Sequence, residues 1–312
     1  MSYFNKKVTT AQLAKICGVS QGTIDRALNN RSDISPATKE KIVNAAKKYG
    51  YMPDISCQSG SKTMLFGIVV FSLYNEYFSR LVMEIENVSK ERGYSTLIMF
   101  SNRDKKTEIE CINRLIFMGV DGIILCPVSD DSDYKSYLNT LKTPIITVGN
   151  KVDGIPYSGI DDYRAMVEVT NYVRSKNYKK IIYYSPPLEK IGDENIYAQN
   201  ERYLGFLSAI SDFPNHIVTT DIERLVASLT NDTAVICTTD YHAIQLTHRR
   251  NGNLCGIIGF DDINILSLLG IRLDSVSYSS NKIAENAAAY LSGASGHELP
   301  RVPHSLVIRG SL

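Results

Sequence analysis

Apolar positions recur at the spacing of short amphipathic helices through the first fifty residues. Three helices are predicted there, over residues 9–16, 21–29 and 36–49. A serine or threonine can cap each first turn, and the third helix also has a proline at its first position. Leu13 and Ile16 share the apolar face of the first helix, and Gly18 allows a tight bend before the second. The pattern predicts a helix-turn-helix head.

From residue 64 onward, short apolar runs alternate with amphipathic stretches. The apolar runs predict buried strands at residues 66–71, 95–100, 122–126, 144–148, 180–184, 234–237 and 255–260. The amphipathic stretches predict helices between them, such as 76–92, 105–118, 162–177 and 197–211. Continuous apolar strands separated by helices are typical of parallel sheets covered on both faces. The sequence therefore predicts an α/β body of two lobes, each with a doubly wound parallel sheet and ligands at the carboxyl ends of its strands.

Composition agrees with a globular chain of more than one domain. Of the 312 residues, 44% are hydrophobic and 21% are charged, which argues against disorder. The apolar runs are far shorter than the roughly 20 residues of a membrane helix, and no signal region follows Met1, so a cytoplasmic, nucleoid-associated protein is expected. The six cysteines form no C-x-x-C pair and are expected to be reduced packing residues.

Charge is unevenly distributed along the chain. Nine Lys and Arg residues against four Asp and Glu residues give residues 1–60 a formal charge of +5, and the remainder carries −4. A basic head on a mildly acidic body indicates a polyanion-binding module joined to a part that need not touch nucleic acid. A solvated face remains an alternative for so modest a surplus.

In a helix-turn-helix unit the second helix enters the major groove and reads base edges. Double-stranded operator DNA is therefore an expected partner, with Arg26 as the candidate for a guanine. The predicted DNA contacts are Thr10, Ser20, Gln21, Gly22, Thr23, Asp25, Arg26, Asn29 and Tyr51. The alternative is a small helical bundle without a role in DNA binding.

Polar and aromatic side chains follow the predicted strands of the body. They are Asn75, Tyr77 and Phe78 after the first strand, then Asn150, Lys151, Asp161, Thr239, Asp240 and Asp261 after later ones. Aromatic faces combined with carboxylates suit a neutral polyhydroxyl ligand, because its C–H faces stack while its hydroxyls pair with charged groups. An aspartate after a strand is also a common helix cap, and Asp162 and Asp262 are expected to be caps.

The head carries four consecutive motifs within Val8–Pro53. They are Thr10-Ala11-Gln12-Leu13-Ala14, Gly18-Val19-Ser20, Thr23-Ile24-Asp25-Arg26-Ala27-Leu28-Asn29 and Tyr49-Gly50-Tyr51-Met52-Pro53. On these motifs the chain resembles the lactose-repressor (LacI/GalR) family of bacterial transcription regulators. The resemblance implies a hinge helix that forms on operator binding. Asp54, Cys57 and Gly60 stand where Asn, Ala and a wedge-forming Leu are common, which weakens the expectation of a minor-groove kink.

The body carries five more motifs of the same family. They are Pro156–Tyr163, Arg202–Phe206, Thr238–Asp240, Ile257–Asp262 and Val307–Ser311. The resemblance implies a periplasmic-binding-protein-like effector domain that dimerises and responds to an inducer or corepressor. It implies that Phe78 stacks on the ligand, that Arg202 grips ligand hydroxyls and that Asp261 is a ligand carboxylate. It also places Tyr278 in the pocket.

The predicted effector is carbohydrate-like: a sugar, sugar acid or polyol, or a sugar phosphate held by Lys151 and Arg202. The predicted domains are a head at 1–53, a hinge or linker at 54–62, and an effector domain at 63–312. Within it, lobe 1 is expected at 63–177 and 280–302, and lobe 2 at 178–279 and 303–312. Closure of the cleft between the lobes would change the spacing of two heads in a homodimer on a dyad-symmetric operator.

Motifs of enzymes and metal sites do not occur in the sequence. No glycine-rich nucleotide loop, G-x-S-x-G elbow or H-E-x-x-H pattern is found, and the five histidines form no ligand-like spacing. No catalysis, cofactor or metal is therefore expected. The alternative to a regulator is a cytoplasmic sugar-binding sensor whose operator binding is weak or lost because of its altered hinge.

Overall fold

The computed structural model describes residues 8–28, 34–49, 51, 62–188, 194–250, 252, 255–294 and 299–312. Two units are described separately: a head within residues 1–62, and a body that spans Thr63–Leu115 and Val120–Leu312. Except for Lys62, the predicted hinge at 54–62 lies outside the described residues, as does Asn29. None of the helices in the described ranges is long and apolar enough to cross a bilayer.

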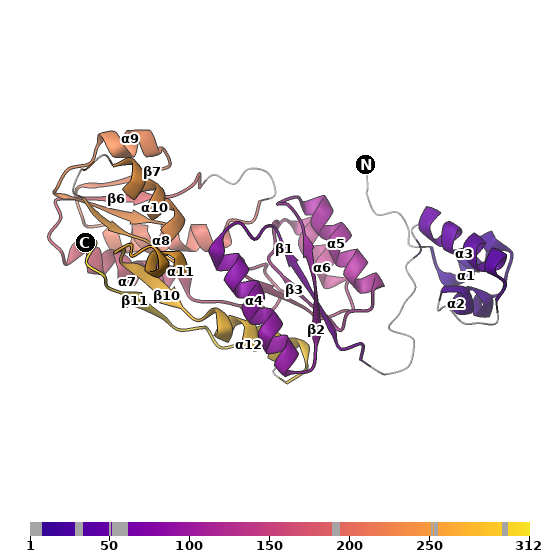
Figure 1. Ribbon diagram of the computed structural model, residues 1–312. Coiled ribbons are helices and arrows are strands. Elements are labelled where there is room, and N and C mark those ends of the chain that lie inside the picture. Colours follow the sequence, from indigo (N-terminus) through magenta and orange to yellow (C-terminus); the bar gives the residue numbers. More distant parts are fainter. Residues whose placement is uncertain are drawn as a thin grey trace. The chain divides into compact units, whose positions relative to one another are not determined.

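Three helices form the head: α1 (Thr10–Cys17), α2 (Gln21–Leu28) and α3 (Pro36–Lys48) (Figure 1). Thr9 caps α1 and forms a capping box with Gln12, and Gly18 ends the helix at φ 68°. Leu13, Ile24 and Ile42 are fully buried at the centre. The expectation for Ile16 is wrong, because Cys17, one full turn after Leu13, is buried and Ile16 is 44% exposed.

The first sheet of the body is fully parallel, with strand order β2-β1-β3-β4-β5. Its strands are β1 (Leu65–Val70), β2 (Ser95–Phe100), β3 (Gly122–Leu125), β4 (Ile145–Val148) and β5 (Tyr157–Ser158). The helices α4 (Glu76–Glu91), α5 (Lys105–Phe117), α6 (Ser132–Asn139) and α12 (Ser280–Leu291) accompany it (Figure 1). Although α12 comes late in the chain, it packs against α4 and β4.

The second sheet is also parallel, with strand order β7-β6-β8-β9. Its strands are β6 (Lys180–Tyr184), β7 (His216–Thr219), β8 (Thr233–Cys237) and β9 (Gly256–Ile258). Its helices are α7 (Asp162–Arg174), α8 (Tyr197–Ile210), α9 (Ile222–Ala227), α10 (Asp240–Arg249) and α11 (Asn264–Leu268). An antiparallel pair, β10 (Ser275–Tyr278) and β11 (His304–Val307), completes the body. The two parallel sheets confirm the predicted α/β fold.

Helix α7 packs against α8 and β8 of the second sheet. The predicted boundary of lobe 1 at residue 177 would instead assign α7 to the lobe of the first sheet. Gly205 explains the close approach, because a Cβ at this position of α8 would lie 2.3 Å from the carbonyl oxygen of Tyr163 in α7. The chain therefore passes from the first sheet to elements of the second just after β5.

Candidate functional site

A cavity of about 640 Å³ lies between the elements of the two sheets, at the carboxyl ends of their strands. Eight predicted ligand residues line it: Asn75, Tyr77, Phe78, Asn150, Arg202, Thr239, Asp261 and Tyr278. Lys151, Asp161 and Asp240 are not among the residues that line it. A volume of this size accommodates a small organic molecule.

Arg202 lies at the centre of a buried polar cluster and is 7% exposed. Its Nε donates to Asp162 Oδ1 at 2.8 Å, its Nη1 to the Thr238 carbonyl at 2.7 Å, and its Nη2 to Asp261 Oδ1 at 3.3 Å. Its guanidinium carbon lies 3.6 Å from the centroid of the Phe260 ring. The Tyr278 hydroxyl also donates to Asp261 Oδ1, at 2.8 Å. These contacts hold two carboxylates rigidly around one guanidinium.

Burial raises the pKa of Asp162 and that of Asp261, while the Arg202 charge opposes both shifts. Burial lowers the pKa of Arg202, but the two carboxylates outweigh it and hold that pKa above its ordinary value. Within the described residues, the Oδ2 atoms of both aspartates have no hydrogen-bond partner. Both residues line the cavity, so these oxygens are acceptors available to a ligand.

Aromatic rings form another wall of the cavity. The Phe78 ring lies edge-on to Phe71 at 4.5 Å and to Tyr77 at 4.9 Å between centroids, and Tyr77 is 5.7 Å from Tyr278. Gly149 has φ 74°, and a Cβ there would lie 3.3 Å from the Phe78 ring. A glycine therefore lets the chain after β4 approach this wall.

The adjacent aspartates at the start of α7, Asp161 and Asp162, have exchanged the roles that the sequence predicts for them. Asp161 is the N-cap, and its Oδ1 accepts from the Arg164 amide at 3.0 Å. Asp162 faces Arg202 instead. The expected cap at Asp262 is wrong as well, because its carboxylate pairs with Arg309 at 2.7 Å. Asp162 is a site residue that the sequence analysis missed.

Three further predicted site residues make structural contacts. The side chain of Asn75 caps α4, and that of Thr239 caps α10 and bonds His242 Nδ1 at 2.7 Å. Asp240 is buried and accepts from the Ser275 hydroxyl at 2.7 Å. Burial, followed by the Asp261 charge, raises the pKa of Asp240 to about 7.

Hydrogen bonds join the two sheets on both sides of the cavity. On one side the Asn150 side chain donates to the Asn195 carbonyl at 2.9 Å and accepts from the Ala198 amide at 3.0 Å. On the other side Glu76 accepts from the amide of Asn264 at 2.7 Å, and Arg80 donates to the Asp261 carbonyl at 3.0 Å. These contacts tie α4 and the end of β4 to the second sheet.

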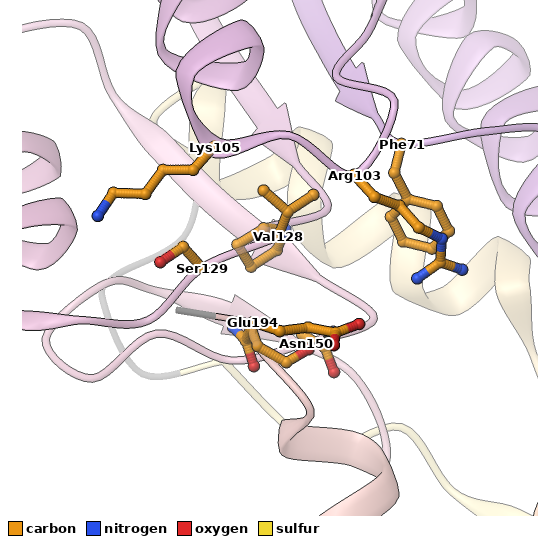
Figure 2. A pocket seen from close by; sticks show the side chains of 9 residues that line it. Phe71, Arg103, Lys105, Val128, Ser129, Asn150 and Glu194 are labelled. Carbon is orange, nitrogen blue, oxygen red and sulfur yellow. Dashed lines mark hydrogen bonds between the residues drawn. The ribbon is translucent and has the colours of Figure 1, made fainter. Parts of the chain in front are cut away.

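A smaller cavity of about 320 Å³, whose lining side chains are drawn in Figure 2, shares five lining residues with the first. Both cavities are lined by Phe71, Arg103, Asn150, Glu194 and Asn195. Lys105, Pro127, Val128 and Ser129 line only the smaller one. Arg103 follows a predicted strand, β2, as the other site residues follow theirs, and this signal could have identified it. In the part of the chain that the structure describes, no three His, Cys, Asp or Glu side chains are placed to hold a metal ion.

In the head, five of the nine predicted DNA contacts lie on α2. Gln21, Gly22 and Arg26 are exposed, and Thr23 and Asp25 are half-buried. The Ser20 hydroxyl caps α2 through the Thr23 amide at 3.1 Å. The hydroxyls of Thr10 and Tyr51 lie 2.7 Å apart, which joins the start of α1 to the segment after α3, and Tyr51 is buried.

Two family models match the chain. One describes periplasmic binding proteins and the sugar binding domain of the LacI family and matches residues 63–222. The other describes bacterial regulatory proteins of the lacI family and matches residues 11–54.

Curated relatives are transcription regulators. Catabolite control protein A of Staphylococcus epidermidis is 26% identical over 284 residues, which cover 85% of this chain and 83% of the relative. The ribose operon repressor of Lactococcus lactis subsp. lactis is 25% identical over 297 residues, which cover 90% of this chain and 89% of the relative.

Solved structures share the fold. A complex of the transcriptional regulator CelR with cellobiose is 20% identical with a TM-score of 0.64, covering 97% of this chain and 99% of the other. The lac repressor dimer bound to operator and the anti-inducer ONPF is 18% identical with a TM-score of 0.67, covering 98% of this chain and 99% of the other.

Proposed function

The chain belongs to the LacI family of sugar-responsive transcriptional regulators, and on this premise we propose that its larger cavity is the effector site. The observation that carries the proposal is the cluster of Asp162, Arg202 and Asp261. Its two open carboxylate oxygens can accept hydrogen bonds from adjacent hydroxyls of a sugar or polyol. The ring of Phe78 offers an apolar face for the C–H side of the same molecule.

The proposed switch is closure of the body around this ligand. Lobe 1 would contain the first sheet with α12, and lobe 2 the second sheet with α7 and the β10–β11 pair. The ligand would bind groups of both lobes, such as Phe78 from α4 and Arg202 from α8, and so favour one lobe arrangement. The hydrogen bond of Asn150 to Asn195 and that of Glu76 to Asn264 connect the two proposed lobes, so they would form or break when the lobes change their arrangement.

The proposed output is a change in operator affinity. Helix α2 would lie in the major groove, with Arg26 reading a guanine, and a homodimer would bind two half-sites about one helical turn (~34 Å) apart. Such a regulator acts where the chromosome is, which places it in the cytoplasm. No catalytic step is part of this function.

Thermal melting of the full-length protein against neutral sugars and polyols tests the effector site. A ligand at 100 times its Kd is expected to add about 2.7 kcal/mol to the free energy of unfolding. Arg202→Ala should lose this gain, whereas Arg164→Ala, which changes an exposed arginine of α7 outside the cavity, should keep it. Equal gains in both variants would refute the proposed site.

A further inference from the structure

The smaller cavity is continuous with the proposed effector site through shared walls, but its chemistry differs (Figure 2). Among the described residues, three cationic side chains line the two cavities: Arg103, Lys105 and Arg202. Any anionic group of a ligand needs one of these cations, because an unpaired charge is costly in a partly dehydrated site. The hydrogen bonds and ion pairs that each of these three side chains already makes decide which of them can bind the anion.

Arg202 is committed to the protein. Each of its three nitrogens already donates a hydrogen bond, two of them to carboxylates. A phosphate or carboxylate placed beside it would also face the negative charges of Asp162 and Asp261. The sequence-based expectation of a sugar phosphate held by Lys151 and Arg202 is therefore not favoured, and Lys151 does not line either cavity.

Arg103 lies at the boundary of both cavities and has no acidic partner among the described residues. Its guanidinium carbon is 4.2 Å from the centroid of the Phe71 ring (Figure 2). Stacking on an aromatic face leaves the planar edge of a guanidinium able to donate two parallel hydrogen bonds. Asn102 and Arg103 both have positive φ, at 52° and 58°. The backbone after β2 therefore adopts a left-handed conformation that is uncommon for residues other than glycine.

The other charged side chains of the smaller cavity, Lys105 and Glu194, determine its net charge. Lys105 pairs with Asp131 at 2.5 Å, and Asp131 also accepts from the Ser129 hydroxyl at 2.5 Å. Glu194 lines both cavities and is exposed. The lining charges of Arg103, Lys105 and Glu194 sum to +1.

We propose that the smaller cavity is an anion subsite: the effector is a carbohydrate with one anionic substituent, a phosphate or a carboxylate, which Arg103 binds. The inference rests on the proposed function, since the hydroxylated ring would occupy the larger cavity against Asp162 and Asp261. Lys105 adds positive potential at the far end, and Glu194 repels the anion and so weakens its binding.

Matched ligands test the subsite at constant ionic strength. Isothermal titration would compare glucose with glucose 6-phosphate and with glucuronate, and ribose with ribose 5-phosphate. At least one anionic member is expected to bind about tenfold or more tightly than its neutral parent, which corresponds to about 1.4 kcal/mol. The phosphate and carboxylate arms identify which anion the subsite prefers. Inorganic phosphate, which needs no ring, is a separate probe by thermal melting.

Variants assign the effect to Arg103. Arg103→Gln should weaken binding of the anionic ligand about tenfold more than binding of its neutral parent, because Arg103 also lines the larger cavity, and Arg103→Lys should retain part of the advantage of the anionic ligand. Glu194→Gln should strengthen anion binding several-fold, because it removes a repulsive charge. Arg164→Gln, which changes an arginine outside both cavities, is the matched control and should change nothing.

The outcomes separate the two proposals. Neutral sugars that bind as tightly as their anionic partners would overturn the anion subsite and leave the effector site standing. Equal losses for both partners in Arg103→Gln would also overturn it. Protection by inorganic phosphate that depends on Arg103, without binding of any sugar, would support the subsite and count against the carbohydrate site. A protein that none of the probes protects would contradict both.

Discussion

Two neighbouring carboxylates, Asp161 and Asp162, show how far the position of one side chain decides its role. Both are consistent with a cap or a ligand-facing group in the sequence, since the pair lies between the apolar residue Ile160 and a predicted helix. In the structure Asp161 caps α7 from outside the first turn, while Asp162 is already in the helix and faces Arg202. The difference arises from where the helix begins, which sequence patterns define only to within a residue or two.

Asp162→Asn is expected to weaken effector binding about tenfold or more. A hydrogen bond to a charged acceptor contributes roughly 1.5–3 kcal/mol, and the amide replaces a carboxylate oxygen that is open to the cavity. Asp161→Asn is the matched control, because asparagine caps helices about as well as aspartate and residue 161 does not line the cavity. Calorimetric titration of the two variants checks this. A greater loss in Asp161→Asn would reverse the assignment.

Glu108 in α5 provides a pH-dependent prediction. It is fully buried, with Oε1 accepting from the Tyr134 hydroxyl and from the Val128 amide at 3.1 Å. Burial raises the pKa of this carboxyl from 4.5 to about 7. The folded state therefore favours the protonated form, so the stability from this group is full below pH 4.5 and is lost as the pH rises to about 7.

Glu108→Gln should consequently melt at a higher temperature than the parent at about pH 8 and nearly the same temperature at about pH 4.5, with a gain on the order of 1–3 kcal/mol at the higher pH. Glutamine keeps an oxygen for Tyr134 and Val128. Asp240 also has a pKa raised to about 7 but titrates in both proteins, so the difference between their melting curves isolates Glu108. A variant that is less stable than the parent at the higher pH would contradict the account.

At the scale of elements, apolar runs identified strands at the edge of a sheet as well as strands inside it. The predicted strands at 95–100 and 180–184 match at both ends β2, an edge strand with no fully buried residue, and β6, an inner strand that is largely buried. The strands β5, β7, β10 and β11 were missed. β5 has only two residues, and β7, β10 and β11 have four residues each with polar side chains among them, so none contains an apolar run of four residues. The packing of α7 on α8 depends on Gly205, whose role no periodic pattern reveals.

Gly205→Ala is expected to destabilise the body by roughly 1–3 kcal/mol, because the new methyl group would overlap the Tyr163 carbonyl at 2.3 Å and force α7 and α8 apart. An isolated helix would instead gain about 1 kcal/mol from the same change. Ser208→Ala, at an exposed position of α8, is the control and should be nearly neutral. Thermal melting of both variants decides the matter, and an alanine at 205 that stabilises the protein would show that the helices do not need this contact.

At the scale of the whole molecule, the sequence predicts a basic reading head and a two-lobed effector body, and a family model matches residues 11–54 of the head and another matches residues 63–222 of the body. The assembly of the pocket was less accessible from sequence. Arg202, Asp261 and Phe78 come from segments far apart in the chain. The resemblance to the family predicted them as ligand residues without knowledge of the fold. Arg103 follows the end of a predicted strand, whereas Asp162 and Glu194 lie in no pattern that separates them from ordinary cap or surface residues, and the fold brings all three to one cavity.

The central claim is that the ligand in the body controls DNA binding by the head. The most direct measurement is operator affinity by fluorescence anisotropy, with and without effector, on a dyad-symmetric duplex selected from a random library by the protein itself. We expect the effector to change the operator Kd at least fivefold, corresponding to a coupling of about 1 kcal/mol or more. Arg26→Ala should lose selective DNA binding and keep effector binding, whereas Arg202→Ala should bind the operator and no longer respond. An effector that binds the protein while the operator Kd stays unchanged would contradict the account.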